Sequence, residues 1–347
     1  MGGSPTDVVP TEPNCAVDLA SDGSRHCAVY QDGSVWCWGG DASGEPSGYA
    51  HSPTPLRVDG LAVATRVFVG PTHVCAITEQ GLSCWGSNDA AQIDGSGASP
   101  LGPTLVAFDS SGTPAPLASV GLGAQQTCIG DVLGHVYCRG VDDRGELAQG
   151  AQIGQLGSAR NRLFTGDFPM VVEDGVVYVI ADWKEPSALP YYGTSNEIVH
   201  AGAPSCVIKV GGSLWCGPYS LDAGELTQKG EISEGSLWVG GGDFFVCALT
   251  GSRRVWCDGW NPAGQLGRGT VDSSAQLLAG DWVVGLEAVR VLSPARFSAC
   301  AVTEDGRVWC WGAYGPTEGA ATPVQVSGCE MQRTVPTERG RATPESL

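Results

Sequence analysis

The stretch CAVYQDGSVWCWG at residues 27–39 decides the fold, because it returns almost unchanged as CAVTEDGRVWCWG at residues 300–312. In each copy, β-branched and aromatic residues flank an Asp-Gly pair, which is typical of two strands joined by a tight turn. The cysteines are ten residues apart, so direct pairing across the hairpin requires a three-residue loop with Gly33 or Gly306 in its left-handed position. The cysteines then face each other at a distance that a disulfide can bridge. The stretch therefore predicts a disulfide-stapled β-hairpin.

Twelve of the 14 cysteines form such close pairs. The expected disulfides join Cys27 with Cys37, Cys75 with Cys84, Cys128 with Cys138, Cys206 with Cys216, Cys247 with Cys257, and Cys300 with Cys310. The nine-residue spacing of the Cys75 pair needs a loop one residue shorter, and Ser252-Arg253 in the turn of the Cys247 pair leaves that loop type open. Since surface disulfides do not persist in a reducing cytosol, we expect a secreted, periplasmic or outer-cell-surface protein.

The first cysteines of these pairs are 48, 53, 78, 41 and 53 residues apart, and the gap of 78 is too long for one repeat. Inside that gap lies MVVEDGVVYV, residues 170–179. Aligned on Asp174-Gly175, it places Pro169 and Val179 at the cysteine positions. The chain then contains seven repeats of a few short strands each, and these predict an all-β, seven-bladed β-propeller.

A second segment follows the hairpins and is clearest as NPAGQLGRG at residues 261–269, with weaker copies at 89–93, 143–147 and 222–226. With these segments, residues 15–329 resemble the regulator of chromosome condensation repeat family, whose repeats contain a histidine that His26 matches. The resemblance implies a seven-bladed propeller and is weakly specific for function. The cysteines replace a Ser/Thr and a variable position of the family repeat, a departure that suits an exported bacterial-type branch.

The two remaining cysteines are expected to close the ring. Alignment of the first two repeats puts Cys15 at the position of Val63, and alignment of residues 323–329 with residues 55–61 puts Cys329 at that of Leu61. These positions are two residues apart elsewhere in the ring, so we expect a disulfide between Cys15 and Cys329. Residues 15–329 are predicted to form a single propeller, between flexible segments at 1–14 and 330–347.

Charge and hydropathy restrict the partners. The net charge of −18 disfavours nucleic acid and anionic lipid and favours a basic protein partner. No apolar stretch is long enough for a transmembrane helix. The start, Met-Gly-Gly-Ser, resembles the residues after the lipidated cysteine of bacterial lipoproteins, so a lipid anchor in a native precursor is one hypothesis and a trimmed start is the other. We expect a monomer.

Catalytic, cofactor and metal sites are not expected. The chain has no Gly-x-Ser-x-Gly, phosphate-binding loop, Cys-x-x-Cys or His-Glu-x-x-His, and its five histidines are scattered. His26 and His73 precede hairpin cysteines and are interpreted as packing residues between blades, as are the tryptophans at repeat positions. Aromatic residues outside those positions are the candidate binding anchors: Tyr49, Tyr191, Tyr192, Trp260 and Tyr314.

These features favour an exported or cell-surface protein-binding scaffold over an enzyme, since rigid propellers present loops from every blade. Such a scaffold could serve as an inhibitor or as an adhesion-type module. The inhibitor is considered because some exported relatives inhibit β-lactamases by covering the active site. A propeller lyase or glycosidase is the alternative, and a charged pocket in the central channel would favour it. Guanine-nucleotide exchange, the family's best-known role, is opposed by the acidity and the disulfides. Specialisation is expected in the fourth repeat, around residues 182–198.

Overall fold

The computed structural model describes residues 15–40, 52–99, 101–108, 116–141, 147–155, 162–164, 170–173, 176–179, 187–188, 195–200, 205–209, 211–217, 226–229, 232–273, 278–313 and 319–327. Strands account for the regular structure of these ranges. They form seven four-stranded antiparallel sheets, each built from four consecutive strands. This arrangement follows from the hairpin repeat, because each strand pairs with the next one along the chain.

The first three sheets cover the N-terminal part of the chain. The first contains β1 (Ala16–Asp22), β2 (Arg25–Tyr30), β3 (Val35–Gly39) and β4 (Ser52–Arg57). The second contains β5 (Ala64–Val69), β6 (His73–Thr78), β7 (Gly81–Gly86) and β8 (Leu101–Leu105). The third contains β9 (Leu117–Leu122), β10 (Gln126–Asp131), β11 (His135–Val141) and β12 (Leu147–Gln155).

The fourth sheet contains the short strands β13 (Arg162–Phe164), β14 (Met170–Glu173), β15 (Val176–Val179) and β16 (Ser187–Ala188). The fifth contains β17 (Ser195–His200), β18 (Ser205–Lys209), β19 (Leu214–Cys216) and β20 (Thr227–Gln228). The sixth contains β21 (Ser236–Gly242), β22 (Phe245–Thr250), β23 (Val255–Gly259) and β24 (Leu278–Trp282). The last contains β25 (Val289–Pro294), β26 (Ser298–Thr303), β27 (Val308–Gly312) and β28 (Ala320–Ser327).

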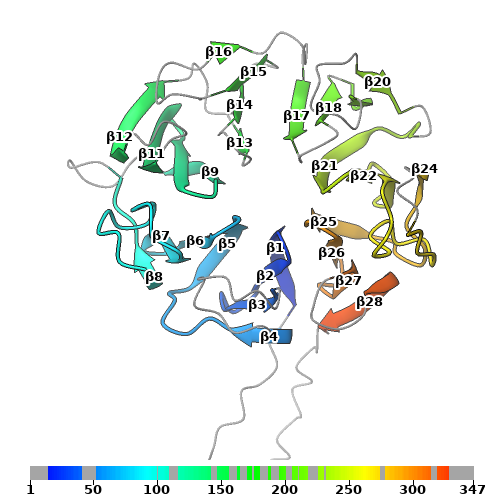
Figure 1. Ribbon diagram of the computed structural model, residues 1–347, viewed down its shortest axis with the longest axis horizontal. Coiled ribbons are helices and arrows are strands. Elements are labelled where there is room, and N and C mark those ends of the chain that lie inside the picture. Colours follow the sequence, from blue (N-terminus) through cyan, green and yellow to red (C-terminus); the bar gives the residue numbers. More distant parts are fainter. Residues whose placement is uncertain are drawn as a thin grey trace, which may run out of the picture.

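The sheets stand around a central opening with their first strands innermost, so the predicted propeller fold is confirmed (Figure 1). The antiparallel order gives the ring two different faces. One face carries the turns between the first and second strands and the connections between the third and fourth; we call it the inner-turn face. The other, the hairpin face, carries the turns of the stapled hairpins and the connections between sheets.

Six disulfides staple the hairpins, and their pairing is the one expected from the cysteine spacing. The bonds join Cys27 to Cys37, Cys75 to Cys84, Cys128 to Cys138, Cys206 to Cys216, Cys247 to Cys257, and Cys300 to Cys310. Each pair occupies directly opposed positions on the second and third strands of its sheet. The Cα–Cα distances are 4.0 or 4.1 Å, so every bond crosses from one strand to its immediate neighbour.

The turns of these hairpins also follow the prediction. Gly33 and Gly306 have the predicted positive φ, at 77° and 78°. In the Cys247 hairpin, Arg253 takes this position at φ 62°. A long side chain thus occupies a conformation that favours glycine.

The cysteine-free repeat forms a sheet, but its register corrects one residue of the predicted alignment. Val179 pairs with Met170 rather than with Pro169, which lies outside the described residues. Glu173 pairs with Val176, so this hairpin is one residue tighter than the ten-spaced ones and matches the Cys75 hairpin in spacing.

Apolar cores lie between neighbouring sheets, as the tryptophan positions predicted. Trp85 of β7 packs with Cys27 and Val29 of the first sheet, and Trp256 of β23 packs with Cys206 of the fifth. Trp311 of β27 packs with Phe245 of the sixth sheet, and its indole N–H donates to the Gln265 carbonyl at 2.8 Å. Each core needs both of its sheets, so a single sheet is not a stable unit.

The ring closes where the first sheet meets the last. Cys15 lies against Gly306 in the way that Val63 lies against Gly33, which confirms the predicted equivalence of Cys15 and Val63. The Tyr30 and Ser327 hydroxyls are 2.7 Å apart across this seam. Cys15 is disulfide-bonded. Its predicted partner, Cys329, lies outside the described residues, as do Met1 and the predicted flexible segments 1–14 and 330–347.

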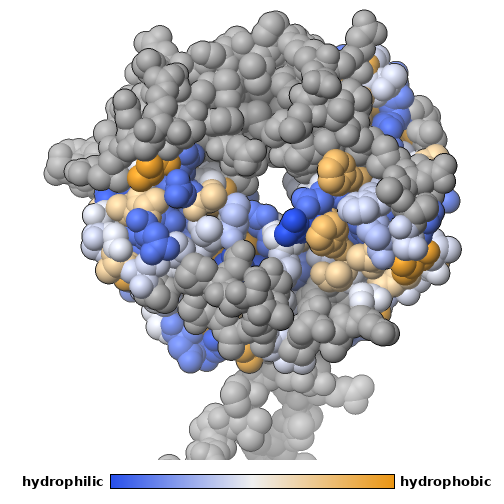
Figure 2. All heavy atoms as spheres, viewed as in Figure 1, coloured by the Kyte–Doolittle hydropathy of each residue, from blue (hydrophilic) through white to orange (hydrophobic). Residues whose placement is uncertain are grey.

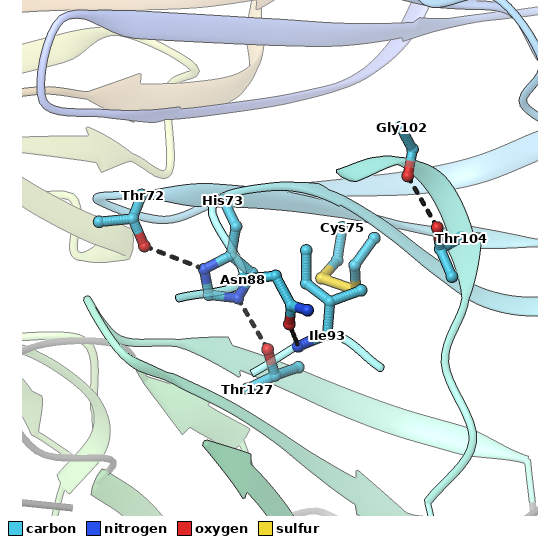
Figure 3. The surroundings of a disulfide bond; sticks show 9 residues. Thr72, His73, Cys75, Asn88, Ile93, Gly102, Thr104 and Thr127 are labelled. Atoms are coloured by element: carbon cyan, nitrogen blue, oxygen red, sulfur yellow. Dashed lines mark hydrogen bonds between the residues drawn. A yellow bond between two sulfur atoms is a disulfide. The ribbon is translucent and has the colours of Figure 1, made fainter. Parts of the chain in front are cut away.

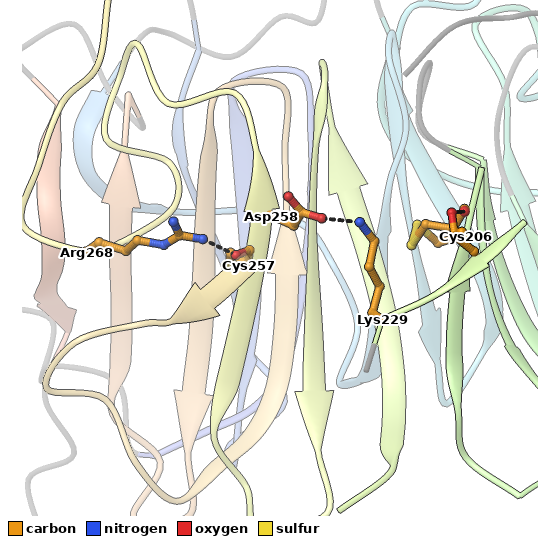
Figure 4. A network of polar contacts seen from close by, with 7 residues as sticks. Cys206, Lys229, Cys257, Asp258 and Arg268 are labelled. Carbon is orange, nitrogen blue, oxygen red and sulfur yellow. Dashed lines mark hydrogen bonds and ion pairs between the residues drawn. A yellow bond between two sulfur atoms is a disulfide. The ribbon is translucent and has the colours of Figure 1, made fainter. Parts of the chain in front are cut away.

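Polar side chains also join the sheets. Nε2 of His73 is 2.7 Å from the Thr127 hydroxyl of the third sheet, beside the Cys75 disulfide (Figure 3). The Lys229 ammonium donates to the buried carboxylate of Asp258, joining the fifth sheet to the sixth (Figure 4). These bonds satisfy polar groups that the ring buries.

Candidate functional site: an aromatic patch on the inner-turn face

One backbone hydrogen bond recurs on the inner-turn face. The last residue of the turn between the first and second strands accepts a bond from the residue that follows the Gly near the end of the third strand. We call these the turn position and the post-glycine position. The pairs are Ser24 with Gly40, Thr72 with Ser87, Gln125 with Val141, Phe244 with Trp260, and Phe297 with Ala313, at N···O distances of 2.7, 3.0, 3.0, 2.8 and 2.9 Å.

Because this bond joins backbone atoms only, the side chains at both positions are free to differ. The first two sheets carry small residues there, whereas the sixth carries Phe244 and Trp260 and the last carries Phe297. Three aromatic side chains therefore gather over two neighbouring sheets at places where the fold also accepts serine, threonine or glycine. We call Phe244, Trp260 and Phe297 the aromatic patch.

The rings of the patch contact each other edge to face. The Phe244 and Trp260 ring centroids are 5.9 Å apart with the planes at 90°, and those of Trp260 and Phe297 are 6.3 Å apart at 64°. Phe244 is 45% exposed. Figure 2 shows hydrophobic residues beside the central opening over these two sheets. Phe244 also has a φ of 58°, a conformation that is rare for a bulky residue and that is often retained for function.

An ion pair borders the patch. Nε of Arg296 donates to the Asp243 carboxylate at 2.8 Å, and the Arg296 guanidinium lies over the Phe297 ring, 5.2 Å from its centroid. The backbone N–H of Asp243 donates to the Arg296 carbonyl at 3.0 Å, and that of Arg296 donates to the Gly23 carbonyl at 2.7 Å. The turns of the sixth, last and first sheets are thus bonded in series, which holds the patch on a rigid platform.

Of the five aromatic anchors proposed from the sequence, Trp260 is placed in this patch. Tyr49, Tyr191, Tyr192 and Tyr314 lie outside the described residues, as does the segment 189–194 within the region where specialisation is expected. Sequence reasoning missed Phe244 and Phe297. The signal was available, because each turn position lies three residues before the first cysteine of a pair and each post-glycine position lies three residues after the second.

The two histidines that precede hairpin cysteines are packing residues. His26 is buried between the first and last sheets, with Nδ1 2.7 Å from the Ser21 hydroxyl and Nε2 3.3 Å from the Ser298 hydroxyl. Burial lowers the pKa of both His26 and His73 to about 3, so both imidazoles are neutral at physiological pH. A neutral, enclosed imidazole fits a structural role between blades.

Three features of the described ranges bear on metal binding, membrane insertion and acid–base chemistry. There, no group of three or more His, Cys, Asp or Glu side chains is arranged to hold a metal ion. No helix with the length and hydropathy to cross a membrane occurs in the part of the chain that the structure describes. Asp18 is the one described carboxyl whose pKa is clearly raised, mainly by burial, and it accepts a bond from the Val67 N–H at 2.9 Å. That bond links the first two sheets and gives Asp18 a structural role.

Comparisons with known proteins agree with the repeat and the fold. The model of the Regulator of chromosome condensation (RCC1) repeat matches residues 296–313. No curated protein sequence matches the chain significantly.

Solved propellers resemble the structure at low identity. The ectodomain of the Arabidopsis thaliana receptor kinase ACR4 is 17% identical with a TM-score of 0.50, covering 88% of this chain and 100% of its own. The ectodomain of the Physcomitrella patens receptor kinase CR4 is 15% identical with a TM-score of 0.51, covering 86% and 74%. PorZ, a surface component of the type-IX secretion system of Porphyromonas gingivalis, is 9% identical with a TM-score of 0.51, covering 90% and 38%. These likenesses show the β-propeller fold, and the repeat match identifies one RCC1-type repeat, in the last sheet.

Proposed function

We propose that the protein is an exported or cell-surface scaffold that binds another protein through the aromatic patch. The observation that carries this proposal is the placement of Phe244, Trp260 and Phe297 at positions where the fold requires only a backbone bond. Phe244 is exposed, and Trp260 and Phe297 are partly buried. Aromatic side chains that are accessible on a rigid surface are typical anchors of protein interfaces. The patch offers apolar area and one ion pair rather than converging titratable groups, which supports binding rather than catalysis.

The disulfides support an oxidising compartment. Six hairpins are stapled in the same way, and such a framework is typical of exported proteins. Two of the solved propellers are receptor ectodomains and a third is a bacterial surface component, so the fold serves such locations in other proteins.

The position of the patch suits a protein held at a surface. Strand β1 begins and β28 ends on the hairpin face, whereas the patch lies on the opposite face. A tether at either end would direct the patch away from the anchoring surface. Prolines in the outermost strands β4, β8 and β28 (Pro55, Pro103 and Pro323) disfavour strand addition at the rim of these three sheets.

The experiment compares three immobilised proteins under non-reducing conditions: the wild type, the double variant Phe244→Ser/Trp260→Ser, and the control Thr72→Ala/Ser87→Ala at the matching positions of the second sheet. Each is incubated with a native surface extract, and any captured protein is purified and titrated directly. We expect the patch variant to lose about 2 kcal/mol of binding free energy, roughly 30-fold in Kd, while the control binds like the wild type. Equal affinity of all three proteins would reject the patch as the interface. Tight binding of a small sugar with no captured protein would reject the scaffold function itself.

A further inference from the structure

The chemistry of the patch indicates what it binds. We propose that the partner presents an arginine- or lysine-bearing loop whose cation lies on the Phe244 and Trp260 rings of the aromatic patch. This rests on the proposed function and specifies the partner's contact residues.

The first support is that this fold already places cations on aromatic rings. Within the described residues, four such contacts occur, at 3.9 to 5.2 Å from the ring centroid. One of them is in the patch itself, where the Arg296 guanidinium covers Phe297. The π-face of an aromatic ring attracts a cation electrostatically. Phe244 and Trp260 have the same chemistry, and Phe244 is open to solvent.

The second support is charge. The chain carries a net charge of −18, which attracts cationic partners and raises their local concentration. Arg296, which borders the patch, is paired with Asp243, so these two charges beside the rings balance each other. An acidic loop would meet the field of the whole molecule and would gain little from the negative faces of the rings.

The third support is rigidity. The series of backbone bonds from Asp243 to Arg296 to Gly23 fixes the turns that carry the rings. Binding a cation to a ring that is already held in place costs less conformational entropy than binding it to a ring on a mobile loop. The same bonds hold Phe244 in its rare backbone conformation, so the ring is presented in one direction.

The test uses a defined probe, a peptide of six alternating Arg-Gly units, and its neutral counterpart with citrulline in place of arginine. Calorimetry at moderate salt measures both peptides against the wild type, Phe244→Ser/Trp260→Ser and Thr72→Ala/Ser87→Ala. We expect the arginine peptide to bind the wild type and the control equally, and to bind the patch variant about ten-fold more weakly. The citrulline peptide should show no measurable binding.

Two results would overturn this inference. Equal binding of the arginine peptide to the wild type and the patch variant would mean that only the net charge attracts it. Equal binding of both peptides to the wild type would mean that the cation is not recognised. Either result leaves the proposed function standing if the native partner still depends on the patch, and the two failures are therefore distinguishable.

Discussion

On the inner-turn face, the same backbone hydrogen bond recurs in sheets whose turn positions carry different kinds of side chain. In the first and second sheets, Ser24 and Thr72 occupy the turn positions, and buried histidines near them bond across to neighbouring sheets. In the sixth and last sheets, Phe244 and Phe297 occupy the turn positions, and the apolar Phe245 fills the space beneath. The recurring backbone bond is the same in both regions, within 2.7 to 3.0 Å. Main-chain atoms thus hold the turns of the propeller, and the side chains of each sheet can have different roles. In the first and second sheets they form buried polar contacts between sheets, which we call the polar seal. In the sixth and last sheets they form an aromatic surface.

Acid should first destabilise the contacts that the buried histidines of the first and second sheets make with neighbouring sheets. This is the largest effect that we expect. The folded-state pKa of His26 and His73 is about 3, below the unfolded value, so the unfolded chain takes up protons first as the pH falls. The stability that both imidazoles contribute is complete above about pH 6.5 and is lost towards pH 3. Between pH 7 and pH 5 the two histidines should together remove about 4 kcal/mol from the free energy of unfolding, which denaturant titrations at each pH measure.

The control distinguishes the titration of the histidines from that of the carboxyl groups, because the two occur in different pH ranges. Hydrogen bonds to the carboxylates of Asp131 and Asp305 leave the pKa of both groups lowered, so they lose their contribution only below about pH 4, outside this window. A His73→Asn variant should flatten the slope by about 1.4 kcal/mol per pH unit. An unchanged slope in that variant would show that His73 is not the group that titrates.

A glycine at the end of a third strand tests the backbone bond in the aromatic region. Gly312 has a φ of 79°, and a Cβ there would lie 2.4 Å from the Phe297 carbonyl oxygen. Gly312→Ala should therefore cost about 3 kcal/mol, from backbone strain and overpacking together. Gly23 is the matched control, since its φ of 60° is also positive but nothing lies within 4 Å of a Cβ. Gly23→Ala should cost about 1 kcal/mol, and thermal unfolding of both variants measures the difference. Equal losses would mean that the close approach to Phe297 does not matter.

Thr127→Val tests the polar seal between the second and third sheets. Valine keeps the shape of the side chain but removes the hydroxyl that lies 2.7 Å from Nε2 of His73. Because both side chains are buried, we expect a loss of about 1–2 kcal/mol in denaturant unfolding, with peptide and partner binding unchanged. The exposed Thr65→Val, whose hydroxyl bonds the Ile77 carbonyl at 3.3 Å, should change stability by less than about 0.5 kcal/mol. Weaker partner binding by Thr127→Val would show that the two regions are coupled.

The sequence predicts the parts of this molecule that local spacing determines. The opposed cysteines, the left-handed Gly33 and Gly306, and the equivalence of Cys15 and Val63 all follow from counting residues around a repeated turn, because strand register is fixed once the turn is known. The pairing of Pro169 with Val179 was wrong because that repeat has no cysteines, and nothing else in its sequence fixes the length of the hairpin loop.

The site was only partly predictable. Trp260 stood out because it lies beyond the repeat motif, but its contact with Phe297 crosses two sheets and depends on how neighbouring turns are stacked. The exposure and positive φ of Phe244 are likewise properties of the assembled ring. The spacing of these residues from the nearest cysteines could have predicted that they occupy equivalent positions. Their distances, exposure and backbone conformation could be learned only from the structure.

The smallest effect concerns the strain at Phe244, and two substitutions isolate it. Phe244→Ala and Phe244→Gly both remove the ring, its contact with Trp260 and its exposed surface, so both should weaken partner binding to the same extent. Only glycine accepts a φ of 58° without strain. The glycine variant should therefore be more stable than the alanine variant by about 1 kcal/mol, which paired denaturant titrations can measure. Equal binding with unequal stability would show that the chain tolerates a strained turn in order to present this ring. If the two variants were equally stable, the positive φ would carry no cost, and the aromatic region would differ from the polar one in its side chains alone.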